Sequence, residues 1–229
     1  MPCCCECDAI DQHFAPARAA EELATYARRG PTGTARLILD ALHGTPLIES
    51  ILDIGAGVGV LHHELLGTVT RSAVHVEAAH AYIDVAREES TRRGHAERVR
   101  FLHGDFLALA PSVASADLVT LDRVVCCYAA FEPLIRLSAE KAGRCHALSF
   151  PHDLWYMRAR TRWQNYRRKR AGNRFRTFVH PVSEIHALIR AAGFSVRRSC
   201  RTLTWEVLVC ARTDVTRAGF GARPGQAVD

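Results

Sequence analysis

A glycine-rich segment with one acidic residue is the part of the sequence best suited to bind a nucleotide-like ligand. Residues 52–60 read Leu-Asp-Ile-Gly-Ala-Gly-Val-Gly-Val. Its candidate ligand-binding positions are Asp53, Gly55, Ala56, Gly57 and Gly59. Glycines at the end of a strand let the backbone approach a ligand with no Cβ in between, and the following helix offers free N–H groups. The segment therefore predicts a cofactor site at a strand-to-helix turn.

Two common nucleotide-binding motifs do not fit this segment. A phosphate-binding P-loop ends in Gly-Lys-Ser/Thr, whereas Gly59 is followed by Val60. The dinucleotide fingerprint places its third glycine three positions after the second, but Gly59 follows Gly57 by only two. Asp53, within the predicted strand, also lies outside that fingerprint. A third type of cofactor is therefore favoured.

Acidic residues also follow the next two predicted strands. Glu77 closes one, and Asp105 with Phe106 follows the other. In combination with Asp53 and the glycines, these positions resemble the class I S-adenosylmethionine-dependent methyltransferases. The resemblance implies S-adenosylmethionine as cofactor, with Glu77 on the ribose hydroxyls, Asp105 at the adenine amino group and Phe106 against the ring. The structural alternative is that Glu77 caps a helix and Asp105 caps a turn.

A narrower resemblance extends over most of residues 20–210. Segments 121–128, 178–180 and 191–194 are similar in order and type to segments of the magnesium-protoporphyrin IX methyltransferases. The sequence departs from that group at Cys127, where the group commonly has histidine, and the stretch that begins at Asp122 is one residue longer. The acceptor molecule therefore stays open.

Three residues are candidates for catalysis: His180, Tyr26 and Asp122. Methyl transfer needs an acceptor lone pair aligned in a dry pocket, and a carboxylate acceptor needs no base. An alcohol or phenol needs one, and an imidazole such as His180 titrates near neutrality. Tyr26 lies on the helix expected to cover the cofactor, and Asp122 holds a position that often faces the acceptor in the family. The alternative for His180 is a packed histidine side chain, and for Tyr26 an ordinary aromatic residue on a helix face. For Asp122 the alternative is a structural turn.

Two adjacent cysteines, Cys126 and Cys127, follow the same predicted strand as Asp122. RNA cytosine methyltransferases use a cysteine nucleophile there. In those enzymes the cysteine follows a proline, and no proline directly precedes Cys126 or Cys127 in this chain. Free cysteines are usually buried and inert. The Asn/Asp-Pro-Pro-aromatic motif of amide and ring-nitrogen methyltransferases is also missing, so O-methylation is favoured.

Arginines and aromatic residues alternate in a predicted helical insert over residues 152–176. As a lid, it would place Trp155, Arg158 and Arg162 beside the acceptor, together with Tyr128. Alternatively, the segment binds RNA by phosphate contacts and base stacking, docks on a membrane or a partner, or is only a solvated face. The lid interpretation is preferred, so nucleic acid is not the favoured partner.

Helical and strand-like segments alternate along the chain, which predicts an α/β, Rossmann-like class I methyltransferase fold. We expect a mainly parallel sheet with a C-terminal antiparallel strand pair and helices on both faces. Predicted strands cover 50–54, 72–76, 98–102, 117–121, 144–150, 194–199 and 203–210. Predicted helices cover 17–29, 34–43, 60–66, 79–93, 131–141, 153–170 and 182–192. The domain is expected over 13–212, between a flexible cysteine-rich start at 1–12 and a disordered tail at 213–229.

Length and composition agree with one globular enzyme domain. The 229 residues are 48% hydrophobic and carry a net charge of +6. No apolar run is long enough to span a membrane and no export signal begins the sequence, so we expect a cytoplasmic protein with reduced cysteines.

Cys3, Cys4, Cys5 and Cys7 lack the spacing of a structural zinc site, and no metal is predicted. The predicted function is methyl transfer to a small, planar or anionic acceptor, with an RNA methyltransferase or a catalytically silent cofactor-binding module as alternatives.

Overall fold

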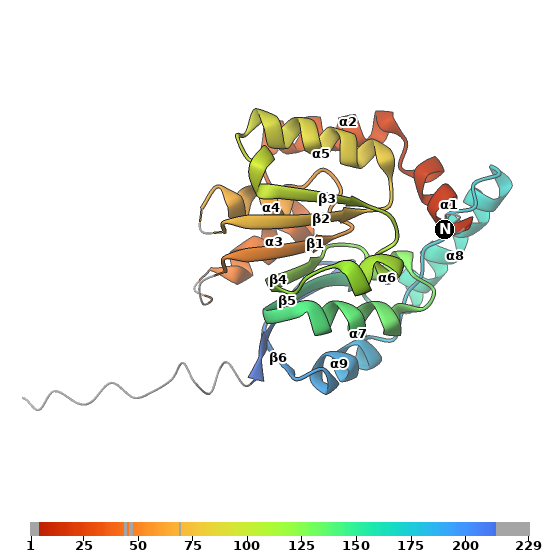
Figure 1. Ribbon diagram of the computed structural model, residues 1–229. Coiled ribbons are helices and arrows are strands. Elements are labelled where there is room, and N and C mark those ends of the chain that lie inside the picture. The colour runs from red at the N-terminus through yellow and green to blue at the C-terminus, as the bar shows by residue number, and fades with distance from the viewer. Residues whose placement is uncertain (1–4, 44, 46–47, 69, 214–229) are drawn as a thin grey trace, which may run out of the picture.

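A seven-stranded sheet forms the centre of the structure (Figure 1). This computed structural model describes residues 5–43, 45, 48–68 and 70–213, with side chains from Ala9 onward. The strands are β1 (Ser50–Ile54), β2 (Ser72–Glu77), β3 (Val99–His103), β4 (Ala116–Leu121), β5 (Ala142–Pro151), β6 (Phe194–Arg201) and β7 (Trp205–Arg212). Their order is β3-β2-β1-β4-β5-β7-β6, with parallel pairing from β3 to β5 and antiparallel pairing of β7 with β5 and β6. The predicted fold class is confirmed.

Helices cover both faces of the sheet (Figure 1). They are α1 (Cys5–His13), α2 (Pro16–Arg29), α3 (Gly33–Leu42), α4 (Val60–Leu66), α5 (His80–Arg92), α6 (Phe106–Leu109), α7 (Phe131–Lys141), α8 (Trp155–Arg170) and α9 (Val182–Ala191). Helices α6, α7 and α9 share one apolar cluster with the sheet, and α3 and α4 share another. In β1 the side chains of Leu52 and Ile54 enter the first cluster and Ile51 enters the second, because successive strand residues point to opposite faces. None of the described helices is both long and apolar enough to cross a membrane.

The carboxyl ends of the parallel strands bring the predicted cofactor residues to one edge of the sheet. Ile54 pairs with Val76, and Glu77 pairs with His103, so the ends of β1, β2 and β3 lie next to each other. Strand β4 flanks β1 on its other side. Ligands of such sheets bind at this edge, where the strand order reverses.

The structure differs from the sequence prediction at the N-terminus. Helix α1 occupies residues 5–13, where a flexible segment was expected. This helix lies beside α8 (Figure 1). It is fixed by tertiary contacts, since the His13 ring stacks on Phe175 at 4.4 Å between centroids and Asp11 accepts a hydrogen bond from the His80 backbone. Residues 214–229 of the expected tail (213–229) and residues 1–4 of the N-terminal segment lie outside the described residues.

Candidate functional site

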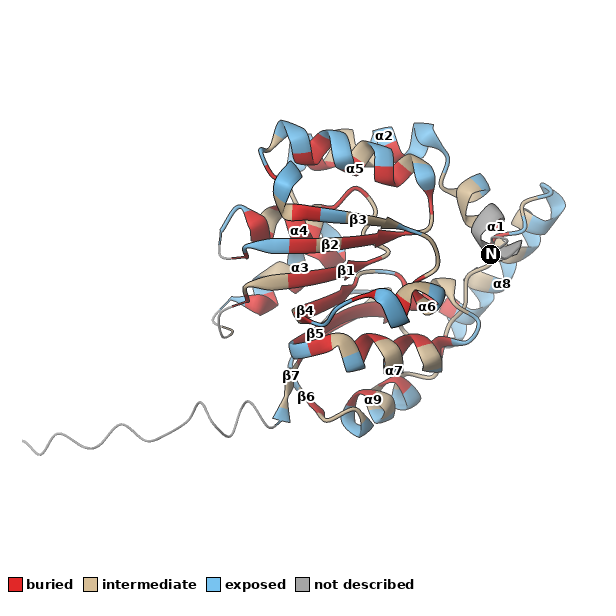
Figure 2. Cartoon of the chain, in the orientation of Figure 1, coloured by how far each residue is buried: buried red, intermediate tan, exposed pale blue. Residues whose placement is uncertain are grey.

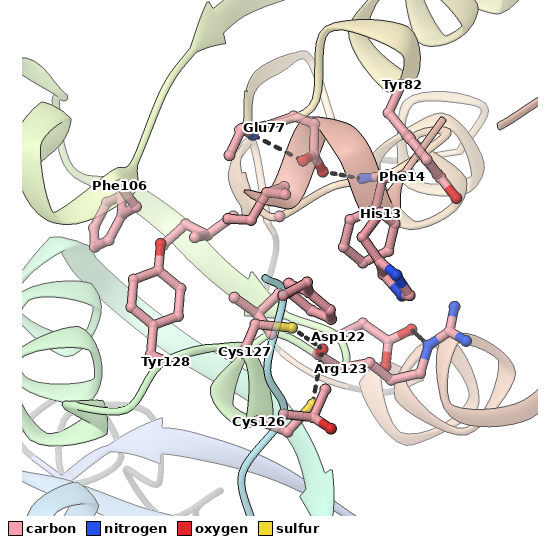
Figure 3. Close-up of a pocket in the computed structure, with 18 of the residues that line it drawn as sticks. His13, Phe14, Glu77, Tyr82, Phe106, Asp122, Arg123, Cys126, Cys127 and Tyr128 are labelled. Carbon is pink, nitrogen blue, oxygen red and sulfur yellow. Dashed lines mark hydrogen bonds and ion pairs between the residues drawn. The ribbon is translucent and has the colours of Figure 1, made fainter. Parts of the chain in front are cut away.

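A cavity of about 240 Å³ opens at the carboxyl edge of the sheet (Figure 3). The glycine loop and the ends of β2, β3 and β4 form one part of its wall, and α1, α8 and the segment after α8 form the other. The cavity lining includes Ile10, His13, Phe14, Arg18, Gly55, Gly57, Glu77, Ala78, Tyr82, Phe106, Asp122, Arg123, Val124, Cys126, Cys127, Tyr128, Arg168, Phe175 and Thr177. A second hollow of about 780 Å³ lies between the glycine loop and α2, and Ala56 lines it. The glycine loop therefore borders both spaces.

The glycine loop has a backbone that only glycine adopts freely. Gly55, Gly57 and Gly59 have φ values of 60°, 59° and 85°. A Cβ on Gly55 would lie 2.5 Å from a methyl carbon of Val124, and one on Gly59 would lie 2.5 Å from Cε1 of His62. The loop thus needs glycine both for its torsion angles and for its close packing.

Asp53 supports this loop from behind and does not line the 240 Å³ cavity. It is 2% exposed, and its carboxylate accepts a hydrogen bond of 2.6 Å from the Thr120 hydroxyl. Its other oxygen lies 3.0 Å from Nδ1 of His62. Because the His62 ring packs under Gly59, Asp53 connects the strand to the loop conformation.

Glu77 ties the end of β2 to the glycine loop. Its Oε1 accepts hydrogen bonds from the backbone N–H groups of Ala78 and Ala79, and Oε2 accepts one from Gly57 at 3.0 Å. Burial raises the pKa of this carboxyl, although the three N–H groups act in the opposite direction. A carboxylate has about four acceptor sites, so Oε2 retains capacity for a ligand hydroxyl.

Asp105 and Phe106 follow β3 as predicted. Asp105 caps α6 by accepting a hydrogen bond from the Leu107 N–H, and the same oxygen accepts a bond of 2.6 Å from the Tyr128 hydroxyl. Its Oδ2 accepts no hydrogen bond from the described residues. Phe106 is 1% exposed, with its ring beside the cavity (Figure 3). Phe106 lines the cavity, whereas Asp105, with its available carboxylate oxygen, lines a neighbouring hollow of about 130 Å³ that shares Tyr128 with the cavity.

The opposite wall comes from residues that sequence reasoning missed. Ile10, His13 and Phe14 face the cavity from α1 and its C-terminal end. Phe175, in the segment after α8, also lines the cavity on this side. The Phe14 ring meets the rings of Tyr82 and Phe175 edge-on at 5.6 and 5.3 Å. The sequence does contain a signal for this helix, because positions 10, 13 and 14 have the i, i+3, i+4 spacing of one helix face.

Three arginines line the cavity: Arg18, Arg123 and Arg168. Among the described residues no carboxylate pairs with Arg168, whose guanidinium donates to the side-chain oxygens of Asn165 and Thr177 at 3.1 and 2.9 Å. Burial lowers its pKa, and the nearby Arg18 acts in the same direction. The cavity therefore contains a half-buried cation without a counter-ion.

Only one of the three candidate catalytic residues lines this cavity. Asp122 does, and its carboxylate accepts a hydrogen bond of 2.6 Å from Ser149, while burial raises its pKa. Tyr26 faces the second hollow and donates a hydrogen bond of 2.6 Å to Glu64. Burial and this bond raise the pKa of Tyr26 far above its usual value.

His180 has a packing position behind the cavity wall. Its ring stacks on Phe131 with 4.2 Å between centroids, and its Nε2 lies 2.9 Å from the carbonyl oxygen of Tyr128. Burial lowers its pKa, although the backbone groups of Tyr128 and Val125 act in the opposite direction. The structure thus does not bring His180 to the acceptor mouth, where it was expected.

Of the predicted acceptor contacts, Tyr128, which follows β4, lines the cavity, whereas those on α8 do not. Trp155 is 80% exposed, Arg158 pairs with Asp153, and Arg162 is exposed. In the cartoon coloured by burial, most of α8 is exposed or intermediate (Figure 2). The helix was placed correctly, but it turns Arg168 and the buried Met157 inward, because side chains on one helix face recur only every three or four residues.

The adjacent thiols of Cys126 and Cys127 lie on the floor of the cavity (Figure 3). Both sulfurs contact the Arg123 carbonyl oxygen, at 3.4 and 3.7 Å. The neighbouring Cys126 thiol and burial raise the pKa of Cys127.

Comparison with known proteins identifies the domain. Residues 51–140 match the family model of a methyltransferase domain. The magnesium protoporphyrin IX methyltransferase from Synechocystis PCC 6803 with bound SAH has a TM-score of 0.64 to this chain at 18% identity, over 89% of this chain and 98% of that one. A putative sarcosine dimethylglycine methyltransferase from Galdieria sulphuraria gives 0.63 at 14% identity, over 79% and 86%. No curated protein matches the sequence.

A doubly wound parallel sheet with an antiparallel C-terminal pair and a glycine loop after β1 defines the class I methyltransferase fold. Residues 51–140 match a methyltransferase domain, and the chain has the fold of the class I S-adenosylmethionine-dependent methyltransferases that the sequence predicted.

Proposed function

We propose that this enzyme transfers the methyl group of S-adenosylmethionine to a carboxylate oxygen of a small, planar, anionic acceptor. The observation that carries the acceptor class is the half-buried guanidinium of Arg168, which has no carboxylate partner among the described residues and lines the cavity. A buried charge is costly without a partner. An anionic ligand supplies that partner.

The residues at the sheet edge fit the cofactor. Phe106 offers an apolar face for the adenine ring, the available Asp105 oxygen accepts from its amino group, and Oε2 of Glu77 accepts from a ribose hydroxyl. Gly55 and Gly57 line the cavity, and with no side chain at either position a ligand can approach the loop backbone closely. Bound S-adenosylmethionine supplies a sulfonium methyl group that is already activated for displacement.

The protein's own contribution is then positioning and exclusion of water. Arg168 holds the acceptor carboxylate, and the stacked rings of His13 and Phe175 cover a planar body. Burial and nearby arginines lower the pKa of His13 to about 4, so this imidazole is a weak base at neutral pH. A carboxylate acceptor needs no proton removed. The weak basicity of His13 therefore suits such an acceptor.

The cofactor is tested by calorimetric titration with S-adenosylhomocysteine, with NAD as the control ligand. We expect binding of S-adenosylhomocysteine alone, and a loss of affinity of about tenfold or more in Glu77→Gln, because an amide N–H₂ would face backbone N–H donors. Glu97→Gln, in the turn before β3, is the matched control. A preference for NAD, or equal affinity in both variants, refutes the proposed site.

The acceptor class is tested by methyl transfer to a panel of planar carboxylic acids and to their amide analogues. We expect turnover of acids only, with KM raised about tenfold or more in Arg168→Gln and unchanged in Arg167→Gln, the neighbouring exposed arginine. S-adenosylhomocysteine affinity should stay unchanged in both variants. Equal turnover of the amides contradicts carboxylate methylation.

A second candidate, an RNA acceptor, is favoured by one observation. Trp155, Arg162, Trp163 and Tyr166 share the outward face of α8, and the three aromatic residues are 57–80% exposed. Exposed aromatic side chains interleaved with arginine stack on unpaired bases. RNA affinity that falls steeply with salt and is lost in Trp163→Ala would support this candidate.

A further inference from the structure

Outside the cavity, three side chains that commonly bind metals meet at the junction of α1 with the sheet edge. Asp11 comes from α1, His80 begins α5, and His103 ends β3. One possible ligand atom from each lies within 4.8 Å of the others. The His80 and His103 rings approach to 3.6 Å between centroids, and Oδ2 of Asp11 lies 2.9 Å from Nδ1 of His80.

We propose that Asp11, His80 and His103 bind a divalent cation of the Zn²⁺ type that fixes α1 over the cavity. Two imidazoles with one carboxylate, and water in the remaining position, is a ligand set that suits Zn²⁺. Zn–N and Zn–O bonds of about 2 Å require the three donors to draw together. His80 and His103 are exposed, so their rings are free to make that adjustment.

The hydrogen bonds within the cluster explain part of its geometry without a metal. Asp11 accepts from the backbone N–H of His80 and so caps α5 from a distance, and Nε2 of His103 lies 3.0 Å from the carbonyl oxygen of Ala78. They do not explain why the His103 ring lies tilted against His80 at 37° between the ring planes. A shared cation, bound through one nitrogen of each imidazole, would hold the two rings this close.

The position of the cluster connects metal binding to the cavity. Asp11 lies between Ile10 and His13 on the helix that forms the cavity wall, and Ala78 follows Glu77 and also lines the cavity. A cation on Asp11 would anchor α1 to the edge of the sheet. By linkage, a metal that holds α1 against the sheet edge raises cofactor affinity, and the cofactor raises metal affinity by the same factor. This second step rests on the proposed function, whereas metal binding does not.

Metal binding is measured first, by calorimetric titration of the full chain with Zn²⁺ and no cofactor. The four N-terminal cysteines are replaced by serine (C3S/C4S/C5S/C7S) because thiols bind Zn²⁺ on their own. We expect one Zn²⁺ per chain with a dissociation constant on the order of micromolar, weakened about tenfold or more by His103→Asn and by Asp11→Asn. Asp11→Asn keeps an oxygen to cap α5, and His43→Asn, at an exposed histidine after α3, is the matched control.

Binding of S-adenosylhomocysteine is then compared with and without Zn²⁺. We expect severalfold tighter binding with Zn²⁺ in the serine background and no effect of Zn²⁺ in His103→Asn. Absence of stoichiometric Zn²⁺ binding, or binding that His103→Asn and Asp11→Asn leave unchanged, overturns the metal site. Zn²⁺ binding in a chain that does not bind S-adenosylhomocysteine supports the metal site and refutes the proposed function instead.

Discussion

The hydroxyl of Tyr128 donates a hydrogen bond of 2.6 Å to Oδ1 of Asp105, and so connects the segment after β4 to the segment after β3. Tyr128 lines the cavity, both residues line a neighbouring hollow of about 130 Å³, and the Leu107 N–H donates to the same oxygen. The two bonds fix the orientation of the carboxylate. Its free oxygen is thereby held in place for a ligand.

Tyr128→Phe should weaken cofactor binding, because it frees the Asp105 carboxylate to rotate while keeping the ring that lines the cavity. A net hydrogen bond to a charged group contributes about 1.5–3 kcal/mol, so we expect the dissociation constant of S-adenosylhomocysteine to rise about tenfold. Tyr166→Phe, on the exposed face of α8, is the control for loss of a hydroxyl. Unchanged affinity in Tyr128→Phe would show that this bond does not orient Asp105.

Gly59→Ala should destabilise the protein more than Gly94→Ala. Both glycines have positive φ values, 85° and 71°, so both variants carry a strain of about 1–2 kcal/mol. A Cβ at position 94 meets nothing within 4 Å, whereas at position 59 it lies 2.5 Å from His62. Chemical denaturation should give an extra loss of about 1–3 kcal/mol for Gly59→Ala, with weaker S-adenosylhomocysteine binding in that variant alone. Equal losses would mean that His62 moves away freely.

Replacing His180 should separate packing from catalysis. His180→Phe keeps a ring stacked on Phe131 and should retain turnover within about twofold, whereas His180→Ala leaves a cavity and should cost roughly 1–3 kcal/mol of stability. Turnover of a planar carboxylic acid and denaturant midpoints are measured for both variants. If both lose turnover about a hundredfold while staying folded, His180 is the base that the sequence suggested.

The parts of the site that sequence reasoning placed well depend on local patterns. Asp53, the glycines and Glu77 lie at or directly after strand ends, and the periodicity of the sequence is enough to predict those strands. The observed β1 and α4 match their predicted ranges at both ends. The strand ends meet at one edge of the sheet because the strands pair in parallel, which the alternation of strands and helices predicts.

The cavity wall formed by α1 and the segment after α8 was not predicted, because it is formed by tertiary contacts. His13 and Phe175 are 162 positions apart in sequence, and their stacking gives neither segment a local signal. For α8, the sequence predicted the helix but not which face turns inward, and Arg168 rather than Arg162 reaches the cavity. The family resemblance suggested a role for His180 but carried no information on how its ring is oriented.

Stability should fall as the pH drops below about 6.5, because several histidines are buried in their neutral form. Burial is the main cause in each case: it lowers the pKa of His63 to about 2, that of His146 to about 3 and that of His75 well below its usual value. Above pH 6.5 these rings are neutral in both folded and unfolded chains and contribute no slope. Below it, the unfolded chain binds protons that the folded chain excludes, at a cost of about 1.4 kcal/mol per pH unit for each histidine.

His146 allows this effect to be measured at one position. Its Nε2 lies 3.0 Å from the Ser138 hydroxyl, and His146→Gln preserves a polar partner there while removing the titration. Urea denaturation at pH 7.5 and pH 5 should show a loss of stability about 2 kcal/mol smaller in His146→Gln than in the native chain. His43→Asn, at an exposed position, should leave the loss unchanged. If His146→Gln retains the full loss, the imidazole of His146 is protonated in the folded protein and its burial does not limit stability in acid.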